Sequence, residues 1–119
     1  MNKYDKRIAR AVNTLRSGST AAFVWNTFRL SLLPEEPLIA ALCSAVLSEA
    51  KDLDLEPLLA SGRLPGDPRA LLDAMRRNNF DELRAYGEGR RAVLCGHAVA
   101  LIACAREVRL GRTYTKPVS

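Results

Sequence analysis

The sequence is poor in the residues on which most catalytic sites depend. It contains one histidine, His97, in 119 residues. Acid–base or nucleophilic catalysis needs a second polar group within hydrogen-bond distance, whereas the helical neighbours of His97 are Leu94 and Leu101. We therefore expect His97 to be a hydrogen-bonded histidine of the core, and we predict that the protein is not an enzyme. An enzyme that uses His97, or Arg90 and Arg91, is a weaker alternative.

Cysteine is also scarce, and its spacing fits neither a metal site nor a disulfide framework. Cys43, Cys95 and Cys104 each lie in an apolar helical run, as free buried thiols do. Structural zinc sites pair cysteines at short spacing, but nine positions separate Cys95 from Cys104 and place them on opposite sides of one helix. We predict no metal and no cofactor, with the reducing cytoplasm as the compartment.

The sequence has no apolar run of membrane-spanning length. Its most hydrophobic stretch, 92–105, is shorter than the roughly 20 residues that cross a bilayer. The first residues are polar and charged, unlike the apolar segment of a signal peptide. We therefore predict a protein without a membrane partner.

Helical periodicity dominates what is present. Apolar residues recur at spacings of three and four, and no stretch alternates like a strand over more than four residues. We predict an all-α, compact single-domain bundle of about six to seven helices over 1–110, followed by a flexible basic tail over 111–119. The expected helices cover 3–17, 20–33, 35–51, 57–60, 68–77, 80–86 and 90–110.

Two local patterns give the expected helix boundaries and the expected core face. Asp67 followed by Pro68 is typical of an N-cap and a first helical residue, and 87–89 contains two glycines that indicate a break. In the last helix, five residues form a short heptad-like seam that we expect to face the core: Leu94, His97, Leu101, Cys104 and Val108.

Charge is unevenly distributed along the chain. The net charge is +5, and 14 of the 18 basic residues are arginine. Residues 1–34 carry a net +5, residues 35–56 a net −5, and residues 57–119 a net +5. Arginine suits phosphate and carboxylate partners, although a G+C-rich genome would produce the same bias, so the composition leaves both explanations open.

The basic residues give one set of candidate binding residues. Lys3, Lys6, Arg7 and Arg10 have the spacing of a single helix face. A glycine-rich segment followed by Arg90 and Arg91 is a weak anion-binding pattern, because Glu88 would repel phosphate. For an anionic partner or a nucleic acid we therefore consider eight residues: Lys3, Lys6, Arg7, Arg10, Arg76, Arg77, Arg90 and Arg91.

Aromatic and acidic residues give a second set, suited to a protein partner. The expected second helix contains Phe23, Trp25 and Phe28, and aromatic side chains anchor protein interfaces. The acidic residues that follow, beginning with Glu35 and Glu36, would fit a basic partner or the basic end of a second copy. The interface candidates are Trp25, Phe28, Glu35 and Glu36, and plain core packing is the alternative explanation for the aromatic residues.

The sequence thus predicts a small helical binding protein without catalytic function. The first hypothesis is a regulator, inhibitor or accessory subunit that acts through protein contacts, with a homodimer as one arrangement that the charge distribution allows. The alternative is a DNA- or RNA-backbone-binding protein, or a ribonucleoprotein subunit, that uses its basic helix faces.

Overall fold

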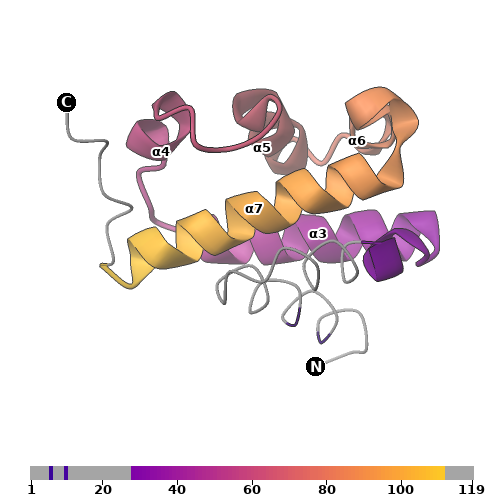
Figure 1. Cartoon of the computed structure of the whole chain (residues 1–119), viewed down its shortest axis with the longest axis horizontal. Helices are drawn as coiled ribbons and strands as arrows, with labels where there is room; N and C mark the ends of the chain where they lie inside the picture. The colour runs from indigo at the N-terminus through magenta and orange to yellow at the C-terminus, as the bar shows by residue number, and fades with distance from the viewer. Residues whose placement is uncertain (1–5, 7–9, 11–27, 112–119) are drawn as a thin grey trace.

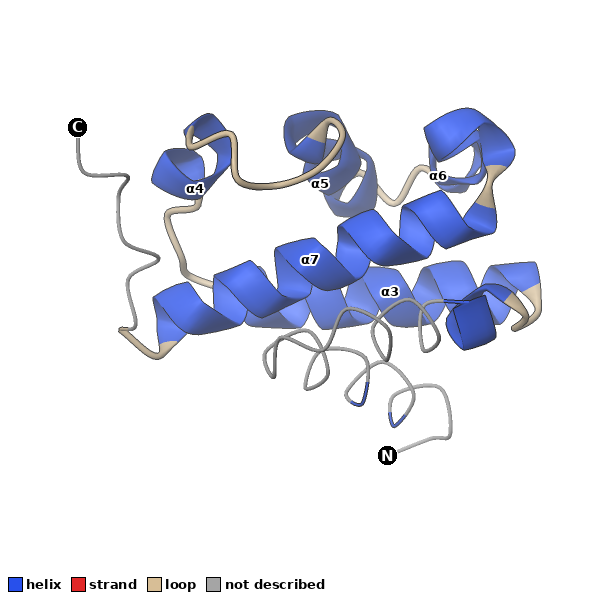
Figure 2. Cartoon of the chain, viewed as in Figure 1, coloured by secondary structure: helices blue, strands red, loops and turns tan. Residues whose placement is uncertain are grey.

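The computed structural model describes residues 6, 10 and 28–111, and these residues are helical or loop, without a strand (Figure 2). This confirms the predicted all-α bundle. The expected helix over 3–17, most of the one over 20–33, and nearly all of the tail lie outside the described residues. The helices in chain order are α3 (Glu35–Ala50), α4 (Glu56–Ala60), α5 (Pro68–Arg76), α6 (Phe80–Ala85), the 3₁₀ helix η1 (Tyr86–Gly89) and α7 (Arg91–Arg109).

Short-range hydrogen bonds fix the ends of the helices. The Asp67 carboxylate accepts the N–H of Ala70 at 3.1 Å, and Pro68 is the first residue of α5, which confirms the predicted cap. Asn79 caps α6 in the same way. At 87–89 the chain turns sharply between α6 and α7, because both glycines and Glu88 have positive φ, and the predicted break is confirmed.

Two long helices, α3 and α7, form the largest interface of the fold. They run in the same direction. At their N-terminal ends, Nη1 of Arg91 donates to the carbonyl of Leu33 at 2.8 Å. At their C-terminal ends, Arg109 donates to carbonyls of the last turn of α3. Parallel neighbours need a long connection, and residues 51–90 provide it, with α4, α5 and α6 lying in a row over the α3–α7 pair (Figure 1).

The core lies between the long pair and this row of short helices. Leu38, Leu42 and Val46 lie four residues apart on α3 and are almost completely buried. The α7 face in the core is broader than predicted and centres on small or branched residues: Cys95, Ala98, Val99, Ile102 and Ala105.

The predicted α7 seam is therefore only partly correct. Leu94 and Leu101 are buried, but His97, Cys104 and Val108 are half-buried at the edge of the core. The expectation that His97 is a hydrogen-bonded core residue is only partly correct: it bonds to Tyr86 but is half-buried, because α7 is rotated so that its small residues take the central positions. Small side chains at those positions let neighbouring helices approach closely.

Arg109 caps the C-terminus of α3. Its guanidinium group donates to the carbonyls of Ser48 at 3.2 Å, Glu49 at 2.8 Å and Lys51 at 2.7 Å. The last carbonyls of a helix lack partners within the helix, and a cation there also interacts favourably with the helix dipole. Three carbonyls at the end of α3 are thus satisfied by one side chain of α7, which is adjacent in space and distant in sequence.

We expect Arg109→Ala to lower the free energy of unfolding by about 1–2 kcal/mol, because three backbone acceptors lose a charged donor at a partly exposed position. Arg76→Ala is the matched control, since Arg76 also ends a helix and makes no ion pair with any residue that the structure describes. Urea unfolding followed by circular dichroism measures both. Equal losses in the two variants would contradict the capping role.

Candidate functional site

Two apolar side chains are exposed on the helical turn that precedes α3. Phe28 is 50% exposed and Leu32 is 65% exposed, although Leu30 and Leu33 beside them are buried. Residues four apart lie on the same face of a helix, so Phe28 and Leu32 point away from the core together. We call Phe28 and Leu32 the apolar ridge. Trp25, the other aromatic candidate, lies outside the described residues.

The two predicted acidic residues begin α3, directly after the ridge. Glu35 and Glu36 lie in the first turn of the helix, where the helix dipole favours negative charge. Nε of Arg84, on α6, lies 3.5 Å from an oxygen of Glu35, and its Nη2 lies 4.0 Å from an oxygen of Glu36. Arg84 also pairs with Asp81. The side chain of Glu36 is nevertheless 77% exposed and is therefore available to a partner.

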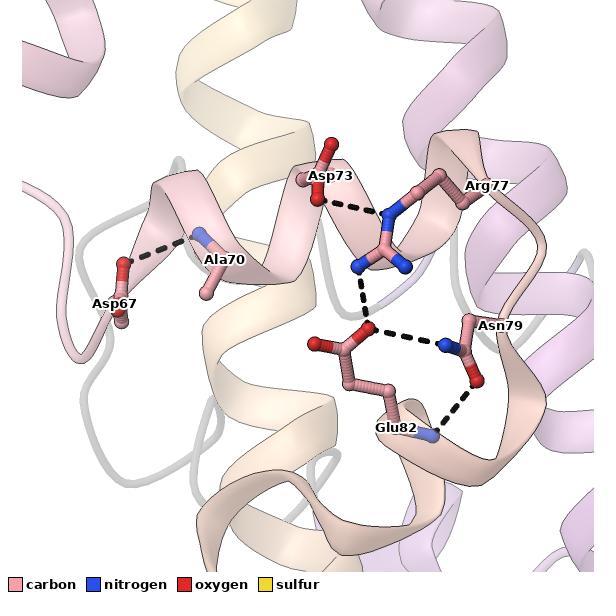
Figure 3. Close-up of polar contacts among 6 residues, drawn as sticks. All are labelled: Asp67, Ala70, Asp73, Arg77, Asn79 and Glu82. Carbon is pink, nitrogen blue, oxygen red and sulfur yellow. Dashed lines mark hydrogen bonds and ion pairs between the residues drawn. The ribbon is translucent and has the colours of Figure 1, made fainter.

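The candidates at the end of α5 differ from one another. Arg77 is held by Asp73, at 2.9 Å from its Nε, and by Glu82, at 2.5 Å from its Nη2 (Figure 3). Asn79 donates to the same Glu82 oxygen at 3.3 Å. Arg76 is exposed and makes no ion pair with the described residues. Of this predicted pair, the structure thus leaves Arg76 available for an anionic partner, whereas Arg77 is already neutralised.

Arg90 and Arg91 lie at the start of α7 and line a shallow hollow. The hollow also contains Arg84 and Glu35, with Leu38 and Leu94 at its floor. Arg84 could not be identified as a candidate from the sequence, because its position in the hollow depends on α6 lying beside the start of α7. The structure does not bring Arg76 or Arg77 into this hollow. Of its three arginines, Arg84 pairs with Glu35, Glu36 and Asp81, whereas Arg90 and Arg91 make no ion pair with the described residues, so the hollow keeps a net positive charge.

Two of the four basic residues expected on one face of the first helix lie within the described residues. Lys6 and Arg10 are both helical and both exposed, which agrees with the spacing that placed them on one face. Lys3 and Arg7 lie outside the described residues.

The single histidine contacts a tyrosine rather than a second catalytic group. Nδ1 of His97 lies 2.7 Å from the hydroxyl of Tyr86, and the two rings meet edge to face. Burial lowers the pKa of His97 below its usual value. The lowered pKa favours the neutral imidazole at pH 7.

The thiols are poorly suited to nucleophilic chemistry. All three cysteines are free. Burial raises the pKa of Cys43 and of Cys104, and it raises the pKa of Cys95 to about 12. Because the thiolate is the reactive form, these groups are protonated and unreactive at neutral pH.

Within the described residues, no group of three or more histidine, cysteine, aspartate or glutamate side chains is arranged to hold a metal ion. None of the described helices combines the length and apolar character that a bilayer crossing requires. Comparison with protein families, with curated proteins and with solved structures found no match for this chain.

Proposed function

We propose that this chain is a non-catalytic binding protein, a regulator, inhibitor or accessory subunit, that docks onto a protein partner through the apolar ridge. The observation that carries the proposal is the exposure of Phe28 and Leu32 on one face, beside buried Leu30 and Leu33. Complete removal of a phenylalanine or leucine side chain from water is worth about 1.5–3 kcal/mol, and Phe28 and Leu32, at 50% and 65% exposure, retain about half or more of that gain. Two such residues can therefore anchor a small interface.

Polar residues around the ridge suit the rim of such an interface. Arg29 and Glu36 are exposed within eight positions of each other, on either side of Leu32. Protein interfaces commonly combine an apolar centre with a polar, solvent-accessible rim. Residues 28–36 combine the apolar ridge with such polar residues on a single short segment.

Two further observations support the non-catalytic part of the proposal. The cysteines are protonated at neutral pH, and Nδ1 of His97 is engaged by the hydroxyl of Tyr86. Neither group has the activated form that nucleophilic or acid–base catalysis uses. Free thiols also suit a reducing compartment, which supports a proposed cytoplasmic location.

Photo-crosslinking tests the ridge directly. We expect a benzophenone amino acid at position 32 to give a discrete adduct in the native cells, because the side chain there would lie inside the interface. The matched control carries the same amino acid at Ala85, which is exposed on α6. The mass of the adduct separates a second copy of this chain from a different protein. No adduct at position 32, or the same adducts at both positions, would contradict the proposal.

Nucleic-acid binding is the second candidate function, and exposed cations favour it. Lys6 and Arg10 are exposed one helical turn apart, and Arg76 and Arg90 are exposed without an ion pair to the described residues. Binding to phosphates weakens steeply with salt. An anisotropy titration at about 50 and about 200 mM salt, repeated with Lys6→Glu and Arg10→Glu, distinguishes this function, because the crosslink at position 32 does not depend on those charges.

A further inference from the structure

The loop over 61–67 is seated on the pair formed by Tyr86 and His97. Gly66 approaches both side chains so closely that a Cβ atom at this position would lie 2.4 Å from Nδ1 of His97 and 2.6 Å from the hydroxyl oxygen of Tyr86. The next residue, Asp67, donates its backbone N–H to the same hydroxyl at 3.4 Å. Leu64, in the middle of the loop, is buried. The loop, η1 and α7 therefore meet at this pair.

The hydrogen bonds at this point specify a neutral histidine. The hydroxyl of Tyr86 accepts the N–H of Asp67 and is free to donate its own proton to Nδ1 of His97. This assignment satisfies the phenol, the imidazole and the loop amide together. An imidazolium would donate from Nδ1 instead, and the phenol proton would then lose the acceptor that it has in this structure.

The charges near His97 do not favour its protonation. In the loop, the carboxylate of Asp67 accepts the N–H of Ala70 as the cap of α5, and the charge of Arg63 interacts with the thiol of Cys104. From α5, Arg69 pairs with Glu56. Burial alone lowers the pKa of His97, so no carboxylate in the part of the chain that the structure describes compensates a charged imidazole.

We propose that the Tyr86–His97 pair is a proton-sensitive latch, which holds the 61–67 loop closed over α7 at neutral pH and releases it in mild acid. Protonation of His97 makes its Nδ1 the donor in the hydrogen bond with the Tyr86 hydroxyl. It also places a poorly solvated charge beneath the loop. Release would expose Leu64 and the edge of α7 below it. This device is separate from the apolar ridge and does not depend on the proposed docking function.

The direction of the pH effect follows from linkage. An open loop exposes His97 to water and returns its pKa toward the ordinary value near 6.5. The closed state binds the proton less well than the open state does. The free energy that favours the closed loop therefore has its full value above about pH 6.5, and it decreases as the pH falls toward the lower pKa that His97 has in the closed state. His97 is the only histidine in the chain, and carboxylates titrate lower, so a change in this range reports on His97.

Amide hydrogen exchange tests the latch in the full chain. After correction for intrinsic rates, we expect protection at Arg63, Leu64 and Gly66 to fall severalfold, up to about tenfold for a pKa difference of one unit, between about pH 7.5 and about pH 5. Protection in α3 should fall less. A ¹H–¹³C titration of the His97 ring should give a pKa below the ordinary value. A uniform loss of protection, or a His97 pKa at or above that value, would overturn the proposal.

Three variants separate the latch from general packing. His97→Asn keeps a polar acceptor near Nδ1 without titrating, and it should remove the pH dependence of the loop. Tyr86→Phe should weaken loop protection already at neutral pH, so the test stands even where His97→Asn does not fold. Val108→Ala, about three turns further along the same side of α7, is the control and should keep the pH dependence. An unchanged loop in Tyr86→Phe, or an unchanged pH dependence in His97→Asn, would rule out the latch.

Discussion

Leu42→Ala should lower the free energy of unfolding by about 3–4 kcal/mol, whereas Leu32→Ala should change it by less than about 0.5 kcal/mol. Leu42 is 0% exposed and Leu32 is 65% exposed. On α3, Leu42 lies between Leu38 and Val46, which are also buried. Truncation there removes buried methyl groups and leaves a cavity that the packed helices close only partly.

The two substitutions form a matched pair because they make the same chemical change. Alanine and leucine have similar helix propensities, so the difference between the variants reports burial. Urea unfolding of both variants, with equal m-values as the check for two-state behaviour, gives the measurement. A loss of more than about 1 kcal/mol in Leu32→Ala would show that the ridge is packed rather than available to a partner. The same variant should keep its fold and lose its partner.

Local signals in the sequence were sufficient to predict most helix boundaries. Asp67 and Pro68 place the start of α5, and the glycines at 87 and 89 place the break before α7, because capping and positive φ depend on residues within a few positions. The prediction of the last helix over 90–110 differs from Arg91–Arg109 by one residue at each end. Such agreement is expected where the deciding interactions are short-range.

The rotation of α7 and the long-range contacts of arginine could not be predicted in this way. Apolar residues occur on several sides of α7, so periodicity alone favours a seam through His97, of which the structure buries only Leu94 and Leu101. Arg109 acts on carbonyls about 60 positions earlier in the chain, and Arg84 reaches Glu35 from a different helix. These contacts depend on the parallel arrangement of α3 and α7, for which a single sequence carries no local signal.

Gly66→Ala should lower the free energy of unfolding by about 2–3 kcal/mol, compared with about 1–2 kcal/mol for Gly62→Ala. Both glycines have left-handed backbones, with φ of +69° and +75°. A Cβ atom at Gly62 would meet nothing within 4 Å, whereas one at Gly66 would overlap His97 and Tyr86. The two variants thus share the backbone strain, and only Gly66→Ala adds a steric clash with the latch.

A double-mutant cycle assigns this extra loss to the histidine. His97→Ala removes the two ring atoms that lie nearest to the added Cβ, Nδ1 at 2.4 Å and Cε1 at 2.5 Å. In the His97→Ala background, Gly66→Ala should therefore cost less than in the unaltered chain, by about 1 kcal/mol of coupling energy. Gly62→Ala should show no such coupling. If Gly66 and His97 were also uncoupled, the loop would not rest on the Tyr86–His97 pair, and the latch would lose its geometric basis.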